Sequence, residues 1–242
     1  MKAFRFLFVF FISAITHAQA PNGFGAGYSD VQSGFSGLRS FFNVVNSEPI
    51  TAPNNPRQLN GTPFFSDEWM KGIITLSDGK SYKGERLRVD LLNTKLFFVN
   101  QDGQEKVCVS AVDRVLLLDS VNGRVYHFIH SYTLPVHPDL KDSAWLEVLQ
   151  PGKAELIKYQ KKELIERASY ASAPEDIIKT QSRYYLLHNK RLYKVAAFRD
   201  LKNILADRKT EIDAYITKQQ PSWKNETDII NLVAYYNSLQ NK

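Results

Sequence analysis

Four tight-turn signals divide residues 72–129 into runs of strand length. They are Asp78-Gly79, Asn93-Thr94, Asp102-Gly103 and Asn122-Gly123. The three glycine-containing pairs reach positive φ at low cost and close two-residue hairpins. Because a parallel crossover needs a dozen or more residues, loops this short force neighbouring strands to run antiparallel. The stretch predicts an antiparallel β-meander, which can be a curled sheet, a sandwich or a partly open barrel.

The runs between these turns have the periodicity of strands. In residues 85–92, Leu87, Val89 and Leu91 alternate with polar residues, as in a strand with one solvated face. Residues 95–99 and 112–118 are apolar on both faces, which is typical of central strands. Further hairpins are expected from residues 144–149 with 154–160 and from residues 183–187 with 191–195.

The apolar period becomes helical after residue 197. Leu201 and Leu205 begin one helical face, a break is expected at residues 207–209, and Asn225 can cap a last helix. The fold class is therefore predicted to be α+β, with an antiparallel β-meander covered by C-terminal helices. Between these parts, residues 161–168 are expected to be a short helix or a strand end, and residues 170–180 a connector.

The first residues have the pattern of a secretory signal peptide. Lys2 and Arg5 precede the apolar run 6–12, and Ala18 offers a small residue before a cut at Gln19. No cysteine stands at this cut, so a lipoprotein anchor is not expected. No later stretch approaches the roughly eighteen apolar residues of a membrane span. We therefore expect an exported protein of the periplasm or cell surface that is soluble after cleavage.

Four segments follow from these patterns. They are a signal peptide at 1–18, a flexible Gly/Pro/Asn-rich arm at 19–60, an antiparallel β domain at 61–196 and a helical tail at 197–242 that packs on the β domain. Within the arm, residues 38–46 are a possible short helix. At the start of the β domain, Phe64, Phe65 and Trp69 are expected to plug one end of the sheet.

Charge and cysteine content exclude two classes of protein. Removing Lys2 and Arg5 lowers the formal net charge from +6 to +4, which is too mild and too dispersed for a nucleic-acid-binding protein. The single cysteine, Cys108, cannot form an internal disulfide, so the fold must be stabilised by burial. Its valine neighbours favour a small buried strand residue over a nucleophile.

No set of residues has the spacing of a catalytic or metal site. His127, His130 and His137 are the best metal candidates, but residues three apart on a strand face opposite sides. Glu147 and Glu155 lie on facing strands of one hairpin, where Lys153 and Lys158 can pair with them. Neither a nucleophile elbow nor a phosphate-binding loop occurs. The sequence predicts no catalytic, metal-binding or cofactor-binding residue.

Two surfaces are compatible with binding. Residues 183–194 alternate aromatic and basic side chains, so Tyr185 and Tyr193 either form an exposed stacking surface or belong to the core beneath the following helix. A hollow sheet lined by Leu96, Phe98 and Leu116 would instead suit a small lipid.

The chain also resembles a family of exported proteins. The similarity rests on Gly61-Thr62-Pro63-Phe64-Phe65, on Leu87-Arg88-Val89-Asp90-Leu91 and on an ending with Tyr235-Tyr236-Asn237. These runs resemble an uncharacterised, signal-peptide-bearing family of Bacteroidota with a β-meander and a C-terminal helical tail. Val89-Asp90 replaces the Tyr-Asn of that family. The resemblance implies an envelope location and this domain shape, and it implies no site residue.

These observations favour a non-enzymatic role. We expect an exported envelope protein that acts as a binding or assembly module. Its partner is expected to be a protein, glycan or lipid of the envelope, and not a nucleic acid. The alternatives are a secreted hydrolase with a dispersed carboxylate site and a small-lipid carrier.

Overall fold

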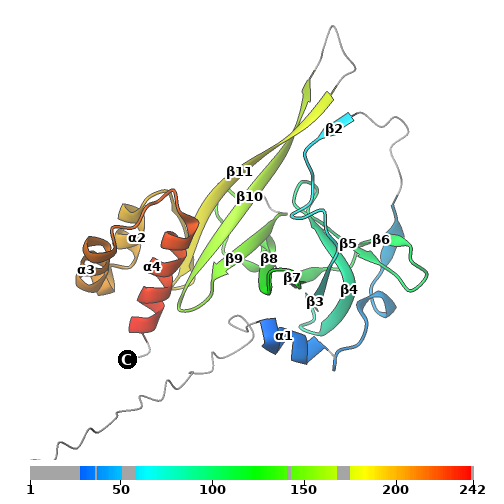
Figure 1. Cartoon of the computed structure of the whole chain (residues 1–242), viewed down its shortest axis with the longest axis horizontal. Helices are drawn as coiled ribbons and strands as arrows, with labels where there is room; N and C mark the ends of the chain where they lie inside the picture. Colours follow the sequence, from blue (N-terminus) through cyan, green and yellow to red (C-terminus); the bar gives the residue numbers. More distant parts are fainter. Residues whose placement is uncertain (1–27, 36, 51–57, 141–142, 168–174, 241–242) are drawn as a thin grey trace, which may run out of the picture.

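The computed structural model describes residues 28–35, 37–50, 58–140, 143–167 and 175–240. They form one open sheet with helices at its C-terminal end (Figure 1). Its strand order is β1-β6-β5-β4-β3-β7-β8-β9-β10-β11-β12, and β2 pairs with β11. Every neighbouring pair is antiparallel except β2 and β11, so the sheet is mixed. The predicted α+β class is confirmed, and the sheet does not close into a barrel.

The strands have the following bounds. The first half of the sheet contains β3 (Met70–Leu76), β4 (Ser81–Asp90), β5 (Lys95–Val99), β6 (Glu105–Cys108), β7 (Val112–Asp119) and β8 (Arg124–His130). The second half contains β9 (Trp145–Gln150), β10 (Ala154–Arg167), β11 (Glu175–His188) and β12 (Arg191–Val195). Two short strands, β1 (Ser47–Pro49) and β2 (Gln58–Asn60), pair with β6 and β11.

The helices have the following bounds. They are α1 (Tyr28–Phe35), α2 (Phe198–Ile204), α3 (Lys209–Gln219) and α4 (Glu226–Leu239). Single 3₁₀ turns occur at η1 (Phe41–Asn43), η2 (Ser131–Thr133) and η3 (Ala206–Arg208). None of the helices among the described residues is long and apolar enough to cross a membrane.

The predicted turns close the predicted hairpins. Gly79 and Gly123 have φ of 80° and 62° at the β3–β4 and β7–β8 turns, where a side chain would be strained. The weaker Asn-Thr turn joins β4 to β5, with Thr94 at φ 57°. Local turn chemistry therefore accounts for most of the strand order. The exceptions are β7, which pairs with β3 and not with its sequence neighbour β6, and the short strands β1 and β2, which pair with β6 and β11.

The β10–β11 hairpin is longer than predicted. Its register runs from Ala154↔His188 to Arg167↔Glu175, so the helix considered at 161–168 and the connector expected at 175–180 are wrong for the described residues. The apolar cross-strand pairs Leu164↔Ile178 and Ile165↔Ile177 explain the extension, because such pairs stabilise antiparallel strands. β9 pairs with β10 only as far as Lys158, so the outer hairpin projects as a ribbon, which β2 joins at Glu175–Ile177 (Figure 1).

One lysine joins this ribbon to the first half of the sheet. The ammonium group of Lys162 donates hydrogen bonds to the carbonyl oxygens of Thr62 (2.8 Å) and Phe64 (2.5 Å). The backbone N–H of Phe65 in turn donates to Val89 of β4 (2.8 Å). The Gly-Thr-Pro-Phe-Phe segment therefore bridges two parts of the sheet. Burial of Lys162 lowers its pKa, because the charged form loses solvation.

Three hydrophobic clusters form the core. The first fills the β3–β8 half and includes Leu87 and Val115. The second packs α2, α3 and α4 against the sheet and includes Leu156 and Tyr236. The third lies on the opposite face of β9–β12 and includes Tyr185. The C-terminal helices therefore cover one face of the second half only, which we call the helix-bearing face.

The last helix is fixed at both ends. The side chain of Asn225 accepts a hydrogen bond from the N–H of Thr227 (3.2 Å), which is the predicted N-cap. Near the other end, the Asn237 amide accepts from the N–H of Ala154 and donates to its carbonyl oxygen, both at 2.9 Å. These bonds satisfy the backbone at the start of β10 and hold α4 on the β9–β10 turn.

The described part of the N-terminal arm is more firmly attached than predicted. Phe41 is completely buried and packs edge to face on Phe98, with ring centroids 5.3 Å apart. β1 extends the edge of the sheet, and α1 contacts β3 and β7. Only residues 41–43 of the expected 38–46 helix are helical, as a 3₁₀ turn. The signal peptide and its cleavage site lie outside the described residues.

Candidate binding site

The three candidate metal histidines are held apart by packing. His130 packs edge to face on Trp145 at 5.1 Å, and His137 packs on Tyr185 at 5.2 Å. His127 is buried on the other face of β8 from His130. Burial lowers the pKa of both His127 and His130, which favours the neutral rings. Among the described residues, no three His, Cys, Asp or Glu side chains are grouped so that they could hold a metal.

The two candidate carboxylates do not face each other. Glu147 pairs with Lys158 across the β9–β10 ladder. Glu155 pairs with Leu187, and both lie on the opposite face of the sheet from Glu147 and Lys158. The two faces differ because side chains alternate along β10. Glu147 and Glu155 therefore form no catalytic dyad.

The aromatic-basic stretch belongs to the core. Tyr185 is completely buried in the third cluster. Tyr184 packs edge to face on Trp223 at 5.9 Å and donates a hydrogen bond to Glu226 of α4 (2.9 Å). The interpretation as core is confirmed for Tyr185, whereas Tyr184 and Tyr193 are both partly exposed.

The residues considered for a lipid cavity do not line one space. Leu96 and Phe98 are buried within the first cluster, against Phe41. Leu116 lies between Val115 and Leu117 of that cluster and so points to the other face of β7. These three side chains therefore contribute to packing on two faces.

Cys108 has the environment of a structural thiol. It ends β6 and is partly buried, and its thiol donates a hydrogen bond to the Ser110 carbonyl oxygen at 3.5 Å. Burial raises the pKa of this thiol to about 11. The thiol is therefore protonated at neutral pH and is a poor nucleophile.

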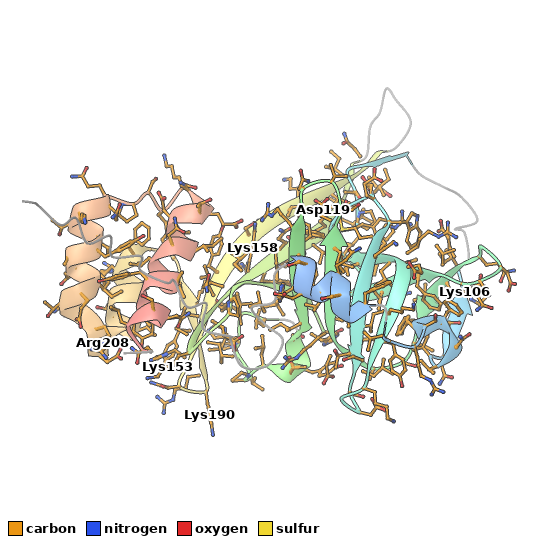
Figure 2. The ribbon with its side chains drawn as sticks, turned by 60° about the horizontal axis from the view of Figure 1, so that its bottom comes forward. Lys106, Asp119, Lys153, Lys158, Lys190 and Arg208 are labelled. Carbon is orange, nitrogen blue, oxygen red and sulfur yellow. The ribbon has the colours of Figure 1, made fainter. Side chains whose placement is uncertain are left out.

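A partly buried polar cluster joins β9, β10, β11 and α4. Lys158 forms an ion pair with Glu226 of α4 at 2.6 Å, and the same carboxylate accepts the hydrogen bond from Tyr184. Glu147 is next to Lys158 in the ladder and only 7 % exposed. In Figure 2, Lys158 lies between α4 and α1. We call Glu147, Lys158, Tyr184 and Glu226 the polar cluster.

The polar cluster contains a carboxyl group that titrates near neutral pH. Burial raises the pKa of Glu147 to about 7, and the Glu226 charge adds to this effect. The positive charges of Lys158 and Arg124 partly offset it. A perturbed carboxyl of this kind is a feature of proton-transfer sites and also of structural charge networks.

A surface hollow lies where β3 begins and β7 ends. Its volume is about 990 Å³. Its lining includes the aromatic residues Phe65, Trp69 and Tyr126 and the polar residues Glu68, Asp119 and Asn122. Asp119 lies on the α1 side of Lys158 in Figure 2. We call this space the strand-end hollow.

The aromatic side chains of the hollow are held in place by their neighbours. Phe65 packs edge to face on Tyr126 (4.7 Å) and on Phe128 (4.9 Å). The guanidinium group of Arg88 stacks on Trp69, 4.2 Å from the ring centroid. Of the three residues expected to plug the sheet end, Phe65 and Trp69 line the hollow, and Phe64 packs edge to face on Phe97 with ring centroids 5.3 Å apart.

The polar rim of the hollow is acidic. The Asp119 carboxylate accepts hydrogen bonds from the backbone N–H groups of Val121 and Asn122 and from the Asn122 amide, at 2.8–3.1 Å. Hydrogen bonds from Asn122 hold the pKa of Asp119 below its usual value, so this group is ionised. Lys71 pairs with Glu85 at 3.5 Å. Among the described residues, no cationic side chain forms an ion pair with Glu68 or Asp119.

The sequence alone could not reveal this site. The Asn122-Gly123 pair predicts the turn after Asp119, but Trp69 lies fifty residues before Asp119. The two regions meet only because β3 pairs with β7, and no local signal predicts that pairing. No local signal predicts Glu226 either, because it joins the polar cluster through the packing of α4.

Comparison of the chain with family models, with curated proteins and with solved structures finds no match. The candidate site therefore depends on its geometry alone. The resemblance to exported Bacteroidota proteins remains a prediction.

Proposed function

We propose that this protein is an exported, non-enzymatic binding module of the cell envelope and that its ligand occupies the strand-end hollow. The observation that carries the proposal is the hollow itself, with immobilised aromatic rings beside an ionised carboxylate. Export is supported by the signal-peptide pattern around Lys2, Arg5 and Ala18.

The dimensions and lining of the hollow support a ligand site. Pockets for small molecules usually measure about 300–1,000 Å³ and combine apolar rings with a few fixed polar groups. The rings of Phe65 and Tyr126 are fixed by each other, and Asp119 is fixed by its turn. A ligand entering the hollow therefore meets groups that need little further ordering, which lowers the entropic cost of binding.

Replacing Trp69 by alanine, which removes the indole ring from the hollow, tests the proposal. The immobilised protein is incubated with detergent-solubilised envelope from its host, and the retained material is quantified. Trp69→Ala is expected to reduce retention about tenfold or more, because a stacked ring contributes about 1–3 kcal/mol.

Tyr132→Ala is the matched control, since Tyr132 is an exposed aromatic residue outside the hollow. It is expected to retain as much material as the unchanged protein. Equal retention by Trp69→Ala and Tyr132→Ala, with both variants folded by circular dichroism, would contradict the proposal.

A hydrolase is the second candidate, and the raised pKa of Glu147 favours it. A carboxyl with a pKa of about 7 is suited to general acid–base catalysis at neutral pH. The test is hydrolysis of an envelope glycan by the two variants. Loss of this activity in Glu147→Gln, with activity kept in Glu155→Gln, would favour a hydrolase over a binding module.

A further inference from the structure

We infer that the ligand of the strand-end hollow is an uncharged oligosaccharide. This inference rests on the proposed function and names the chemical class of the ligand. It depends on three properties of the hollow: its charge, its aromatic surfaces and its hydrogen-bonding groups.

The charges of the hollow disfavour anions. Among the described lining residues, Lys71 is paired with Glu85, so Glu68 and Asp119 leave the lining with a net negative charge. The guanidinium groups of Arg88 and Arg124 stack on Trp69 and Tyr126 and are not part of this lining. Phosphate groups, uronates and fatty-acid carboxylates would be repelled by the carboxylates of Glu68 and Asp119. The lining cation Lys71 is already paired with Glu85 and does not offset this repulsion. A neutral ligand meets no such penalty, and the guanidinium groups on Trp69 and Tyr126 disfavour a cationic sugar stacked on the same rings.

The aromatic groups of the hollow suit a sugar ring. Arg88 occupies one face of the Trp69 indole, which leaves the other face for the hollow that Trp69 lines. The C–H groups on one face of a pyranose are weakly positive and pack on the negative face of an aromatic ring. Tyr126 lines the same hollow but is contacted by Phe65 and Arg124, so Trp69 is the main stacking surface.

The polar lining of the hollow combines carboxylate acceptors with amide and hydroxyl groups, which suits a hydroxyl-rich ligand. The carboxylates of Glu68 and Asp119 can accept O–H donors only, and the Asn122 amide can accept or donate. Asp119 is already oriented by the turn that follows it. A lipid chain would displace water from the Glu68 carboxylate without offering it a hydrogen bond, which costs free energy.

Calorimetric titration with chemically defined hexamers tests the inference. The neutral probes are maltohexaose, cellohexaose, mannohexaose and xylohexaose. The charged probes are a galacturonate hexamer and a glucosamine hexamer, and phosphatidylglycerol vesicles represent lipid. We expect at least one neutral hexamer to bind more tightly than every charged probe and the vesicles.

Three variants locate the binding. Trp69→Ala is expected to weaken affinity for the neutral hexamer by about 10- to 100-fold, as for loss of one stacked ring. Asp119→Asn is expected to weaken it by about tenfold, because hydrogen bonds to charged groups are the stronger ones. Tyr132→Ala should bind as the unchanged protein does.

The outcomes separate this inference from the proposed function. If no neutral hexamer binds, or if a charged probe or the vesicles bind best, while envelope retention still depends on Trp69, the saccharide inference is wrong and the binding module stands. If a neutral hexamer binds equally well to Trp69→Ala, the hollow is not the site and both are wrong.

Discussion

Replacing Glu147 by glutamine is expected to raise the free energy of unfolding at pH 8 by about 3 kcal/mol. Glu147 is 7 % exposed, and burial raises its pKa from the ordinary value of 4.5 to about 7. Each unit of pKa difference corresponds to about 1.4 kcal/mol between the protonation states. Above pH 7 the folded protein must hold a buried carboxylate, and glutamine removes that charge while keeping nearly the same shape.

The raised pKa of Glu147 also determines how the stability of the protein changes with pH. Because the pKa of Glu147 is raised in the folded state, its favourable contribution is complete below about pH 4.5 and is lost as the pH rises through about 7. Urea denaturation at pH 5 and pH 8 measures both variants. The benefit of Glu147→Gln should be several-fold larger at pH 8 than at pH 5.

Glu85→Gln is the control for this titration. The Glu85 side chain is 51 % exposed and pairs with Lys71 at the surface, so its replacement should change stability by less than about 0.5 kcal/mol at either pH. A Glu147→Gln variant that is destabilised at pH 8, or equally affected at both pH values, would show that the carboxylate is better compensated than its burial indicates.

Gly72→Ala is expected to cost about 3 kcal/mol or more. Gly72 lies on β3 between β4 and β7, and an added Cβ would lie 2.2 Å from the carbonyl oxygen of Leu116 and 2.9 Å from Leu87. The first contact is with backbone, so relief requires the two strands to separate. Overpacking in a core costs about 1–3 kcal/mol even when only side chains have to move.

Gly34→Ala provides the comparison, because it makes the same chemical change where space is open. Nothing lies within 4 Å of an added Cβ there, and Gly34 is in α1. This variant should be unchanged or about 0.5–1 kcal/mol more stable, since alanine favours helix. Urea midpoints compare the two substitutions. Similar stability of Gly72→Ala and the unchanged protein would contradict the β3–β7 pairing that forms the strand-end hollow.

Local signals made much of the fold predictable. The Asp-Gly and Asn-Gly pairs set the β3–β4, β5–β6 and β7–β8 turns, and residues 95–99 were predicted as a strand with the bounds that β5 has. The alternation at Leu87 and Val89 correctly predicted their burial. These features depend on neighbours within a few residues, so a single sequence contains the information.

The remaining parts depend on contacts that are distant in sequence. The outer β10–β11 ribbon is mixed polar and apolar, and it forms through cross-strand pairs and through Lys162 rather than through a regular period. The burial of Phe41 depends on the position of Phe98. The candidate site combines Trp69 with Asp119 and Tyr126, which meet only after β3 pairs with β7. A turn or periodicity argument cannot place such residues together.

The position of a bound ligand tests the central claim most directly. Crystals of the protein soaked with the neutral hexamer that binds most tightly would show where the sugar lies. We predict sugar rings in the strand-end hollow, against Trp69 and Tyr126, with hydroxyl groups within hydrogen-bond distance of Asp119. Sugar bound instead against Glu147, or on the exposed Leu164 and Ile165 of the ribbon, with the hollow empty, would contradict the account.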